Sequence, residues 1–348
     1  MLSFSELFFE LTGHPPFPWQ ARLFSEFANA DLRKDDFRKS CDVPTGLGKT
    51  SVIAIWLLAL AHRAGRGDHQ GFPRRLIYVV NRRTVVDQAT REAEGLRKAL
   101  TTKPGLEPLA ASLRSLGSGF SETALAISTL RGEFADNAEW RSDPAQPAII
   151  VGTVDMIGSR VLFAGYGCGF KSKPLHAGLL GQNSLLVHDE AHLEPAFQRL
   201  VETIESEQRN HREFRPVRVM QLTATARPSG SVESILSDAD RAHPEALKRL
   251  RAKKAIEFVD VGDRNTVSQK IVECALRYKD SGNAILLFLR ELKQLEEVCN
   301  ALKKNGLEGR LQRLTGTMRG FEREAMLKDN PIFARASKQR SKDTNDKD

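Results

Sequence analysis

Between residues 42 and 225, short apolar runs alternate with longer amphipathic stretches. The runs occupy residues 76–80, 148–151, 185–188 and 217–222. Short runs rich in Val, Ile and Leu are typical of strands buried on both faces, and the stretches between them are long enough for crossover helices. The pattern therefore predicts a doubly wound α/β lobe built on a parallel sheet.

Two stretches of this first region lack the pattern. Residues 103–143 are rich in Gly, Ser, Pro and charged residues, and residues 165–183 contain five glycines. Such a composition is typical of loops. We expect both stretches to be surface excursions from the first lobe.

A second, shorter α/β pattern follows. A polar helical segment at residues 232–254 leads to three apolar runs, which we expect to be strands separated by two helices. The runs lie at residues 256–261, 284–289 and 310–314, and the helices at about residues 266–279 and 291–304. Three strands make an incomplete lobe. We therefore divide the chain into a first lobe (1–260), a partial second lobe (261–330) and a charged, disordered tail (331–348).

The composition fits a globular protein of two ordinary domains. The chain has 348 residues, of which 41% are hydrophobic and 28% are charged. Its formal net charge of +8 favours a polyanionic partner such as nucleic acid, although the same charge also fits ordinary solubility.

Cysteine usage and the N-terminus bear on the compartment. Cys41, Cys168, Cys274 and Cys299 are scattered, without the spacing of a disulfide framework or a zinc site. The first ten residues contain acids and no basic region, and the longest apolar run, residues 52–61, is too short to span a bilayer. We expect a cytoplasmic protein with no export signal and no membrane anchor.

The segment from Pro44 to Thr50 has the composition of a phosphate-binding loop. It precedes an apolar helix predicted at residues 51–63, so consecutive backbone N–H groups and the helix N-terminus can face phosphate oxygens. Thr45, Gly46 and Gly48 form the cradle, where the glycines allow a close approach. Lys49 is expected to reach the β- and γ-phosphates of ATP, and the Thr50 hydroxyl to ligate Mg²⁺.

The loop departs from the strict phosphate-loop pattern at one position. Val43 stands where that pattern has its first glycine. Helicases commonly keep only the shorter pattern Pro-Thr-Gly-x-Gly-Lys-Thr. The departure at Val43 therefore favours helicases among the proteins that have a phosphate loop.

A pair of acids follows the apolar run at residues 185–188. Asp189 is expected at the carboxyl end of a strand, beside the phosphate loop, where it holds Mg²⁺ through water. Glu190 is expected to polarise the attacking water as the general base. His192 completes an Asp-Glu-Ala-His string and is expected at the interface between two lobes.

Three further residues are candidates for recognising adenine or for linking the nucleotide site to bound nucleic acid. Thr223 and Thr225 follow the last predicted strand of the first lobe, where their hydroxyls can link Asp189 and His192 to nucleic acid. Gln20 precedes the phosphate loop by about 25 residues, and its amide can pair with adenine, although an ordinary surface glutamine is the alternative.

Three loops after predicted strands carry residues suited to phosphate contacts along a single strand. These residues are Arg82, Arg83, Arg131 and Thr153. Such contacts fix position without reading sequence. For the arginines, solvated loop chemistry is an equally good explanation.

With these motifs the chain resembles superfamily 2 DEAH-box helicases, and more narrowly the CRISPR-associated helicase of type I interference systems. The narrower resemblance rests on residues 43–50, 129–132, 152–155, 159–167 and 314–320, and covers most of residues 15–330. It implies two RecA-like lobes, ATP and Mg²⁺ as cofactors, and single-stranded DNA as the track, with Arg160 as a further DNA contact. It also implies an RNA-guided surveillance complex as partner and a His-Asp nuclease that receives the strand.

The resemblance is incomplete in two respects. We recognise no metal-binding His-Asp pair of the nuclease, and no later helicase motif with its arginine finger, since Arg319 and Arg323 fit the preceding motif. An arginine finger accelerates related phosphoryl transfers by about 10³ to 10⁵. We therefore expect a truncated or split form of such a helicase, which binds ATP with little turnover alone, and, in the case of a split form, a separate polypeptide that carries the remaining helicase and the nuclease. Two alternatives are another DEAH-type RNA helicase or restriction-type translocase, and a non-catalytic nucleotide-dependent adaptor.

Overall fold

The computed structural model describes residues 2–30, 37–119, 122–130, 137–224, 235–252 and 255–316, together with Met318 and Met326. The chain forms two compact units, Met1–Lys253 and Lys254–Asp348, whereas the sequence pattern placed the boundary at residue 260.

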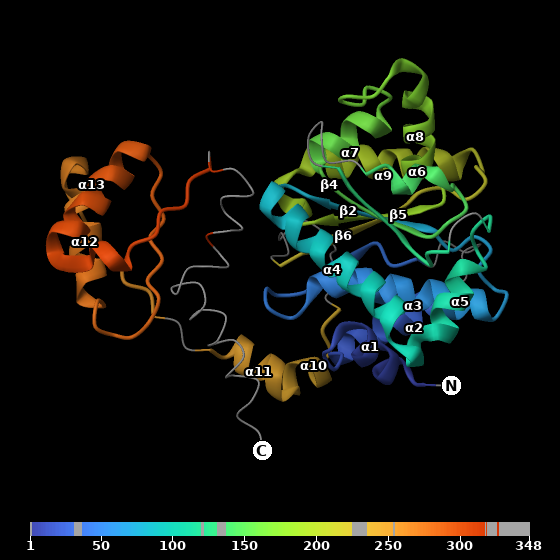
Figure 1. The fold of residues 1–348 in the computed structure, drawn as a ribbon, viewed down its shortest axis with the longest axis horizontal. Coiled ribbons are helices and arrows are strands. Elements are labelled where there is room, and N and C mark those ends of the chain that lie inside the picture. Colours follow the sequence, from blue (N-terminus) through green and yellow to red (C-terminus); the bar gives the residue numbers. More distant parts are fainter. Residues whose placement is uncertain are drawn as a thin grey trace. The chain divides into compact units, whose positions relative to one another are not determined.

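The first unit is built on one sheet of six parallel strands (Figure 1). The strands are β1 (Ser40–Asp42), β2 (Arg75–Val80), β3 (Ala126–Leu130), β4 (Ala148–Thr153), β5 (Ser184–Asp189) and β6 (Arg218–Thr223). Their order across the sheet is β1-β6-β5-β2-β4-β3. The four strands expected from the apolar runs are confirmed as β2, β4, β5 and β6, and so is the doubly wound α/β fold class.

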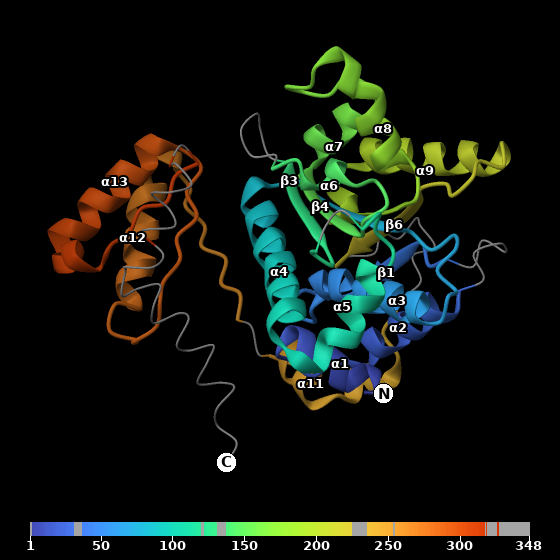
Figure 2. The same cartoon turned by 45° about the vertical axis from the view of Figure 1, so that its right-hand side comes forward.

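Helices cover both faces of this sheet (Figures 1 and 2). One side holds α1 (Phe4–Thr12), α2 (Pro18–Asn29), α3 (Val52–Gly65), α4 (Arg83–Thr102) and α5 (Glu107–Arg114). The other side holds α6 (Glu139–Ser142), α7 (Val154–Val161), α8 (Lys173–Gly181) and α9 (Pro195–Asn210). After β6 come α10 (Asp238–Ala242) and α11 (Pro244–Leu250).

Alternation along each strand divides the core into two clusters. Leu76 and Tyr78 face the α3 side, while Ile77 and Val79 face the α9 side. Helix α3 is buried on nearly every side, which explains why its sequence is apolar throughout rather than amphipathic. It confirms the helix expected after the phosphate loop.

Both stretches expected to be surface excursions contribute to the fold instead. Residues 103–143 contain α5, whose Leu109 and Leu113 are buried, and the edge strand β3. Residues 165–183 contain α8. The prediction was wrong because Ser and Thr in β3 and glycines in α8 weaken the local pattern, while burial against neighbouring elements compensates.

Within residues 255–316, the second unit forms the helices α12 (Val267–Arg277) and α13 (Leu292–Leu302), at the positions expected. Val272, Ala275, Val298 and Leu302 form its small buried cluster. The expected strands are absent from its described residues, and Phe258 in the first of those runs is 93% exposed. A parallel strand needs neighbouring strands and cover on both faces, and this unit supplies neither in full.

Short 3₁₀ and π turns complete the described elements. The 3₁₀ turns are Lys49–Ser51, Pro104–Leu106, Phe170–Ser172, Ala191–Leu193, Arg264–Thr266 and Glu308–Arg310, and Lys303–Leu307 is a π turn. Within the described part of the chain, no helix is both long and apolar enough to cross a bilayer.

Candidate nucleotide site

Three adjacent strands bring the predicted nucleotide-binding motifs to one edge of the sheet. The phosphate loop follows β1, and the acids end β5, with β6 between these two strands. Asp42 pairs in register with Thr223, and Asp189 pairs with Leu222. Because all three strands are parallel, their carboxyl ends meet at the same edge, where open α/β sheets bind ligands.

Successive side chains along β5 point to opposite faces of the sheet, and this alternation separates two neighbouring residues. Leu185, Val187 and Asp189 share the face covered by α3, the helix that follows the phosphate loop. His188 points to the opposite face, where its Nδ1 lies 2.8 Å from Gln198 Oε1 on α9. Burial lowers the pKa of His188. The acid therefore faces the site, and the histidine before it belongs to the core.

The backbone of the phosphate loop is open to a ligand. Thr45, Gly46 and Gly48 are exposed, and the two glycines have φ angles of 89° and 75°. Positive φ angles of this kind cost little conformational energy in glycine but are unfavourable for residues with a side chain. A Cβ at Gly48 would lie 3.0 Å from Gln20 Nε2, so a larger residue would also collide with the segment behind the loop.

Lys49 and Glu190 form an ion pair between the two motifs. Glu190 has a left-handed φ of 52°, an uncommon angle that turns its side chain back toward the loop. Its other oxygen lies 3.5 Å from His192 Nδ1, and His192 Nδ1 lies 3.4 Å from Thr223 Oγ1. A continuous chain of polar contacts therefore runs from the phosphate loop to the end of β6.

The two carboxylate oxygens of Asp189 differ in their hydrogen bonds. Its Oδ2 accepts a hydrogen bond of 2.8 Å from the Tyr78 hydroxyl, whereas its buried Oδ1 has no partner among the described residues. Burial raises the pKa of Asp189, an effect that the Tyr78 hydrogen bond and the charge of Lys49 oppose. A buried carboxylate oxygen without a partner fits a role in holding hydrated Mg²⁺.

Tyr78 is a site residue that the sequence reading missed. Its hydroxyl contacts Asp189 and also interacts with the side chain of Thr50, so it joins both predicted magnesium-binding residues. Burial raises the pKa of Tyr78 well above its ordinary value, and the nearby Asp189 raises it further. The one available signal was a hydroxyl within an otherwise aliphatic run, residues 76–80.

Gln20 lies behind the phosphate loop and is 3% exposed. Its Oε1 accepts a hydrogen bond of 2.8 Å from the Phe17 backbone, and its Nε2 donates one of 2.5 Å to Ser51 Oγ. Trp19, its neighbour on α2, donates from Nε1 to the Leu47 carbonyl at 3.1 Å. Helix α2 thus braces the loop, and adenine reading by Gln20 stays a prediction.

Arg249 is a second residue that the sequence did not indicate. It extends from α11 and donates from Nη1 to the Gly46 carbonyl, while its guanidinium lies 5.7 Å from the centre of the Phe17 ring. This contact spans about two hundred residues of sequence, so no local motif could have revealed it. It places an exposed cation beside the phosphate loop.

The predicted nucleic-acid contacts divide into accessible, buried and undescribed residues. Arg82 is exposed at the start of α4, next to Asn81, whose side-chain amide has no partner among the described residues. Thr153 is buried and accepts from the Met156 backbone at 3.4 Å, which caps α7. The side chain of Arg83 is not described, and Arg131 and Thr225 lie outside the described residues.

Arg160 differs from the other predicted contacts because it is only 4% exposed. Its Nη1 donates to the Met156 carbonyl at 3.0 Å within α7. A direct contact with a nucleic-acid strand would require α7 or the following turn to move.

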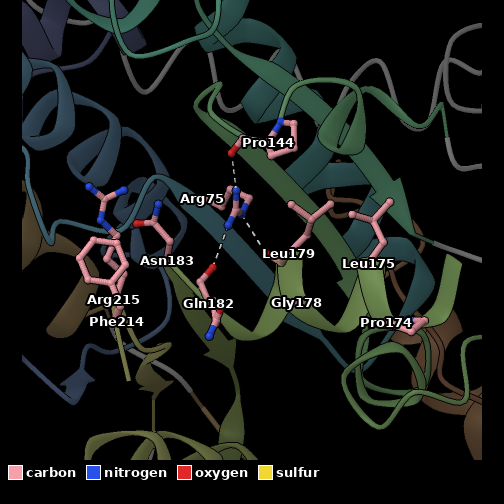
Figure 3. A pocket seen from close by; sticks show the side chains of 10 residues that line it. All are labelled: Arg75, Pro144, Pro174, Leu175, Gly178, Leu179, Gln182, Asn183, Phe214 and Arg215. Carbon is pink, nitrogen blue, oxygen red and sulfur yellow. Dashed lines mark hydrogen bonds between the residues drawn. The ribbon is translucent and has the colours of Figure 1, made fainter. Parts of the chain in front are cut away.

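A cavity of about 370 Å³ opens at the opposite edge of the sheet, away from these motifs (Figure 3). Arg75 begins β2 there and donates to the carbonyls of Pro144, Leu179 and Gln182 at 2.7 to 2.8 Å. Because three carbonyls already satisfy this guanidinium, it joins connecting segments rather than awaiting a ligand.

Comparison with known proteins identifies a family and several similar folds. The model of the family described as "Type III restriction enzyme, res subunit" matches residues 14–227. No curated protein matches the chain. Among solved structures, the DEAD-box helicase Mss116 bound to ssRNA and UDP-BeF is similar with a TM-score of 0.53 and 16% identity, over 93% of this chain and 61% of that one. This likeness shows a RecA-like fold.

Two further structures are similar at lower scores. The DUF1998 helicase MrfA has a TM-score of 0.47 and 14% identity, over 85% of this chain and 39% of that one. Dbp5 of S. cerevisiae, bound to RNA and ADP BeF3, has a TM-score of 0.49 and 16% identity, over 94% and 71%. The chain thus spans less than two thirds of the length of MrfA and of Mss116.

Proposed function

The chain belongs to the type III restriction enzyme res subunit family and has a helicase-like fold, and from this premise we propose that it is an ATP-dependent nucleic-acid motor. One observation carries the proposal most directly. Lys49 of the phosphate loop, Glu190 and the Asp189 oxygen that has no partner in the described part of the chain lie at one edge of one sheet. These are the groups that nucleotide hydrolysis needs.

Each residue has a definite task in this proposal. Lys49 leaves Glu190 and binds the β- and γ-phosphates, which frees the Glu190 carboxylate to accept a proton from the attacking water. Asp189 and Thr50 hold Mg²⁺, and Tyr78 keeps both side chains in place. Bound magnesium would neutralise the charge that develops on the phosphate oxygens.

The contact between His192 and Thr223 supports coupling between the nucleotide and a bound strand. His192 touches Glu190 on one side and Thr223 on the other, so a change at the carboxylate can reach the end of β6. We propose that this path links hydrolysis to movement on nucleic acid.

We further propose that the track is single-stranded DNA and that the chain acts in CRISPR interference. The segments at residues 129–132, 152–155 and 159–167 support this narrower assignment through the resemblance described above. The guide complex and a His-Asp nuclease would then be its partners.

Steady-state ATPase measurements with single-stranded DNA and RNA test the proposal. Glu190→Gln should keep nucleotide binding and lower hydrolysis by about 10² to 10⁴, as loss of a general base does. Glu194→Gln is a matched control, because Glu194 is exposed and four residues further along. Equal hydrolysis by both variants would contradict the assignment of the base, and stimulation by RNA alone would favour the RNA helicase alternative.

A further inference from the structure

A cysteine, a histidine and an arginine form a second polar cluster, separate from the nucleotide site. Cys168 Sγ lies 3.0 Å from His176 Nδ1, and Arg141 Nη1 lies 3.2 Å from His176 Nε2. His176 is 2% exposed, whereas Cys168 is partly exposed and Arg141 is exposed. The sequence reading found no function for these scattered cysteines because the partner of Cys168 is a histidine rather than another cysteine.

The arginine determines which ring nitrogen carries the proton. A guanidinium group only donates, so His176 Nε2 must accept the bond from Arg141. The neutral ring then holds its proton on Nδ1 and donates it to the sulfur of Cys168. The sulfur of Cys168 therefore accepts this hydrogen bond, while its own S–H faces the Tyr166 carbonyl at 3.6 Å.

Cys168 lies in the turn between α7 and α8, two helices that are labelled in Figure 1. Phe163, Gly165 and Gly167 have left-handed φ angles of 59°, 46° and 67°. A Cβ at Gly165 would lie 3.0 Å from Cys168 Sγ and 3.8 Å from Arg160 Cγ, so the thiol and the Arg160 side chain pack against the same glycine. For a bulky residue such as Phe163 this backbone angle is costly, which indicates that the surrounding contacts define the turn.

A second cation lies beneath this turn. Arg160 is almost fully buried, and its Nε has no hydrogen-bond partner among the described residues. Reactive cysteines occur in partly exposed surroundings with positive charge and hydrogen-bond donors. Cys168 has such surroundings, with Arg141 acting through His176 and Arg160 under the turn.

The other three cysteines lack this combination. Cys41 and Cys299 are buried, and burial raises the pKa of Cys41 to about 12. Cys274 is partly exposed like Cys168, and Arg277 Nη2 lies 3.3 Å from its sulfur, but no histidine contact is described for it. Cys274 is therefore a natural internal control.

We propose that Cys168 is a nucleophilic modification site for small hydroperoxides, with His176 as its positioning donor. After the thiol has released its proton to solvent, its sulfur attacks one peroxide oxygen, so an S–O bond forms while the O–O bond breaks. The sulfur is oxidised by two electrons to sulfenic acid, and the peroxide is reduced by two electrons. The departing hydroxide takes up a proton from solvent and leaves as water. A tight turn around the thiol favours small electrophiles, and the neighbouring arginines stabilise the departing anion.

The test treats the full chain with hydrogen peroxide at pH 7, traps sulfenic acid with dimedone and locates the label by peptide mass spectrometry. Cys168 should be labelled about ten-fold faster than Cys274, since rates follow thiolate character and access. His176→Leu should remove most of this advantage, while His176→Asn, which keeps a donor near the position of Nδ1, should retain much of it. Equal labelling of the two cysteines in the unmodified chain would overturn the proposal.

Three further variants allow the test to decide the proposal even where a change at His176 disturbs folding. Arg141→Met changes an exposed side chain, so it reports on the donor path even where a change at buried His176 disturbs folding, and unchanged labelling would overturn the proposal. Arg277→Met beside Cys274 is the matched control and should leave Cys168 unaffected. Lys49→Ala should also leave Cys168 labelling unchanged, which separates this site from the proposed motor function.

Discussion

Both units of the chain contain apolar runs that alternate with amphipathic helices. Among the described residues, only the runs of the first unit form a sheet. In the first unit, Leu186 of β5 has a strand on either side and helices on both faces. In the second unit, Leu286 lies in a similar run and is 70% exposed. The difference teaches that an apolar run becomes a strand only where other strands and covering helices complete its surroundings.

The largest expected effect is on stability, and it tests this comparison with one substitution in each unit. Leu186→Ala should lower the free energy of unfolding by about 3 kcal/mol, because it leaves a cavity in a closed core. Leu286→Ala should change it by less than about 0.5 kcal/mol, as exposed substitutions do. Scanning calorimetry measures both. A comparable loss for Leu286→Ala would mean that its run is buried after all.

The next effect concerns the nucleotide site, whose residues described above all lie in the first unit. Lys49→Ala should weaken Mg-ATP binding about 100-fold, because it removes a charged partner of the phosphates. Lys270→Ala in the second unit, where Lys270 pairs with the exposed Glu273, should leave binding unchanged. Isothermal titration calorimetry compares the two. Unchanged affinity in the first variant would contradict the phosphate-loop assignment.

A smaller effect is expected at the tyrosine that joins the two magnesium-binding residues. Tyr78→Phe removes a hydrogen bond that lowers the pKa of Asp189, so this pKa should rise further and Mg-ATP binding should require a higher pH. We expect about a ten-fold loss of affinity at neutral pH, equivalent to one such hydrogen bond. Tyr278→Phe, at an exposed tyrosine of the second unit, is the control. Identical pH profiles for the two variants would exclude a positioning role for Tyr78.

The smallest effect is a dependence of stability on pH. Burial raises the pKa of Glu92 on α4 to about 7 from an ordinary value of 4.5. A raised pKa means that folding favours the protonated form, so this contribution is full below pH 4.5 and is lost as the pH rises toward 7. Glu92→Gln should therefore stabilise the first unit at pH 8 by about 1 to 2 kcal/mol. The thermal unfolding of this variant is measured between pH 5 and 8. Glu296→Gln, at an exposed glutamate of the second unit, is the control. If the unfolding temperatures of the two variants changed with pH in the same way, the prediction would be wrong.

The sequence predicted the parts of the fold that depend on local pattern. The strong apolar runs gave β2, β4, β5 and β6. Strand β3 escaped notice because Ser128 and Thr129 interrupt its apolar residues, whereas its neighbour β4 and the helices α4 and α6 supply the missing cover. The opposite error in the second unit has the same origin, since a run of residues does not reveal whether partners exist.

The candidate site shows the same limit. The phosphate loop and the acids at the end of β5 are local motifs, so both could be recognised in the sequence. The pairing of Lys49 with Glu190 and the roles of Tyr78 and Arg249 depend on strand order and on contacts between distant segments. Such contacts follow from tertiary packing, which no motif encodes.

The alternation along β5 has a consequence for how this gene can change. His188 and Asp189 differ by one position and face opposite sides of the sheet, one toward the core under α9 and one toward the phosphate loop. Deleting a single residue upstream in the strand would exchange these environments without altering the local chemistry of either side chain. Point substitutions among its aliphatic residues should therefore survive selection far more often than insertions or deletions, and variation in length should accumulate in the loops on either side.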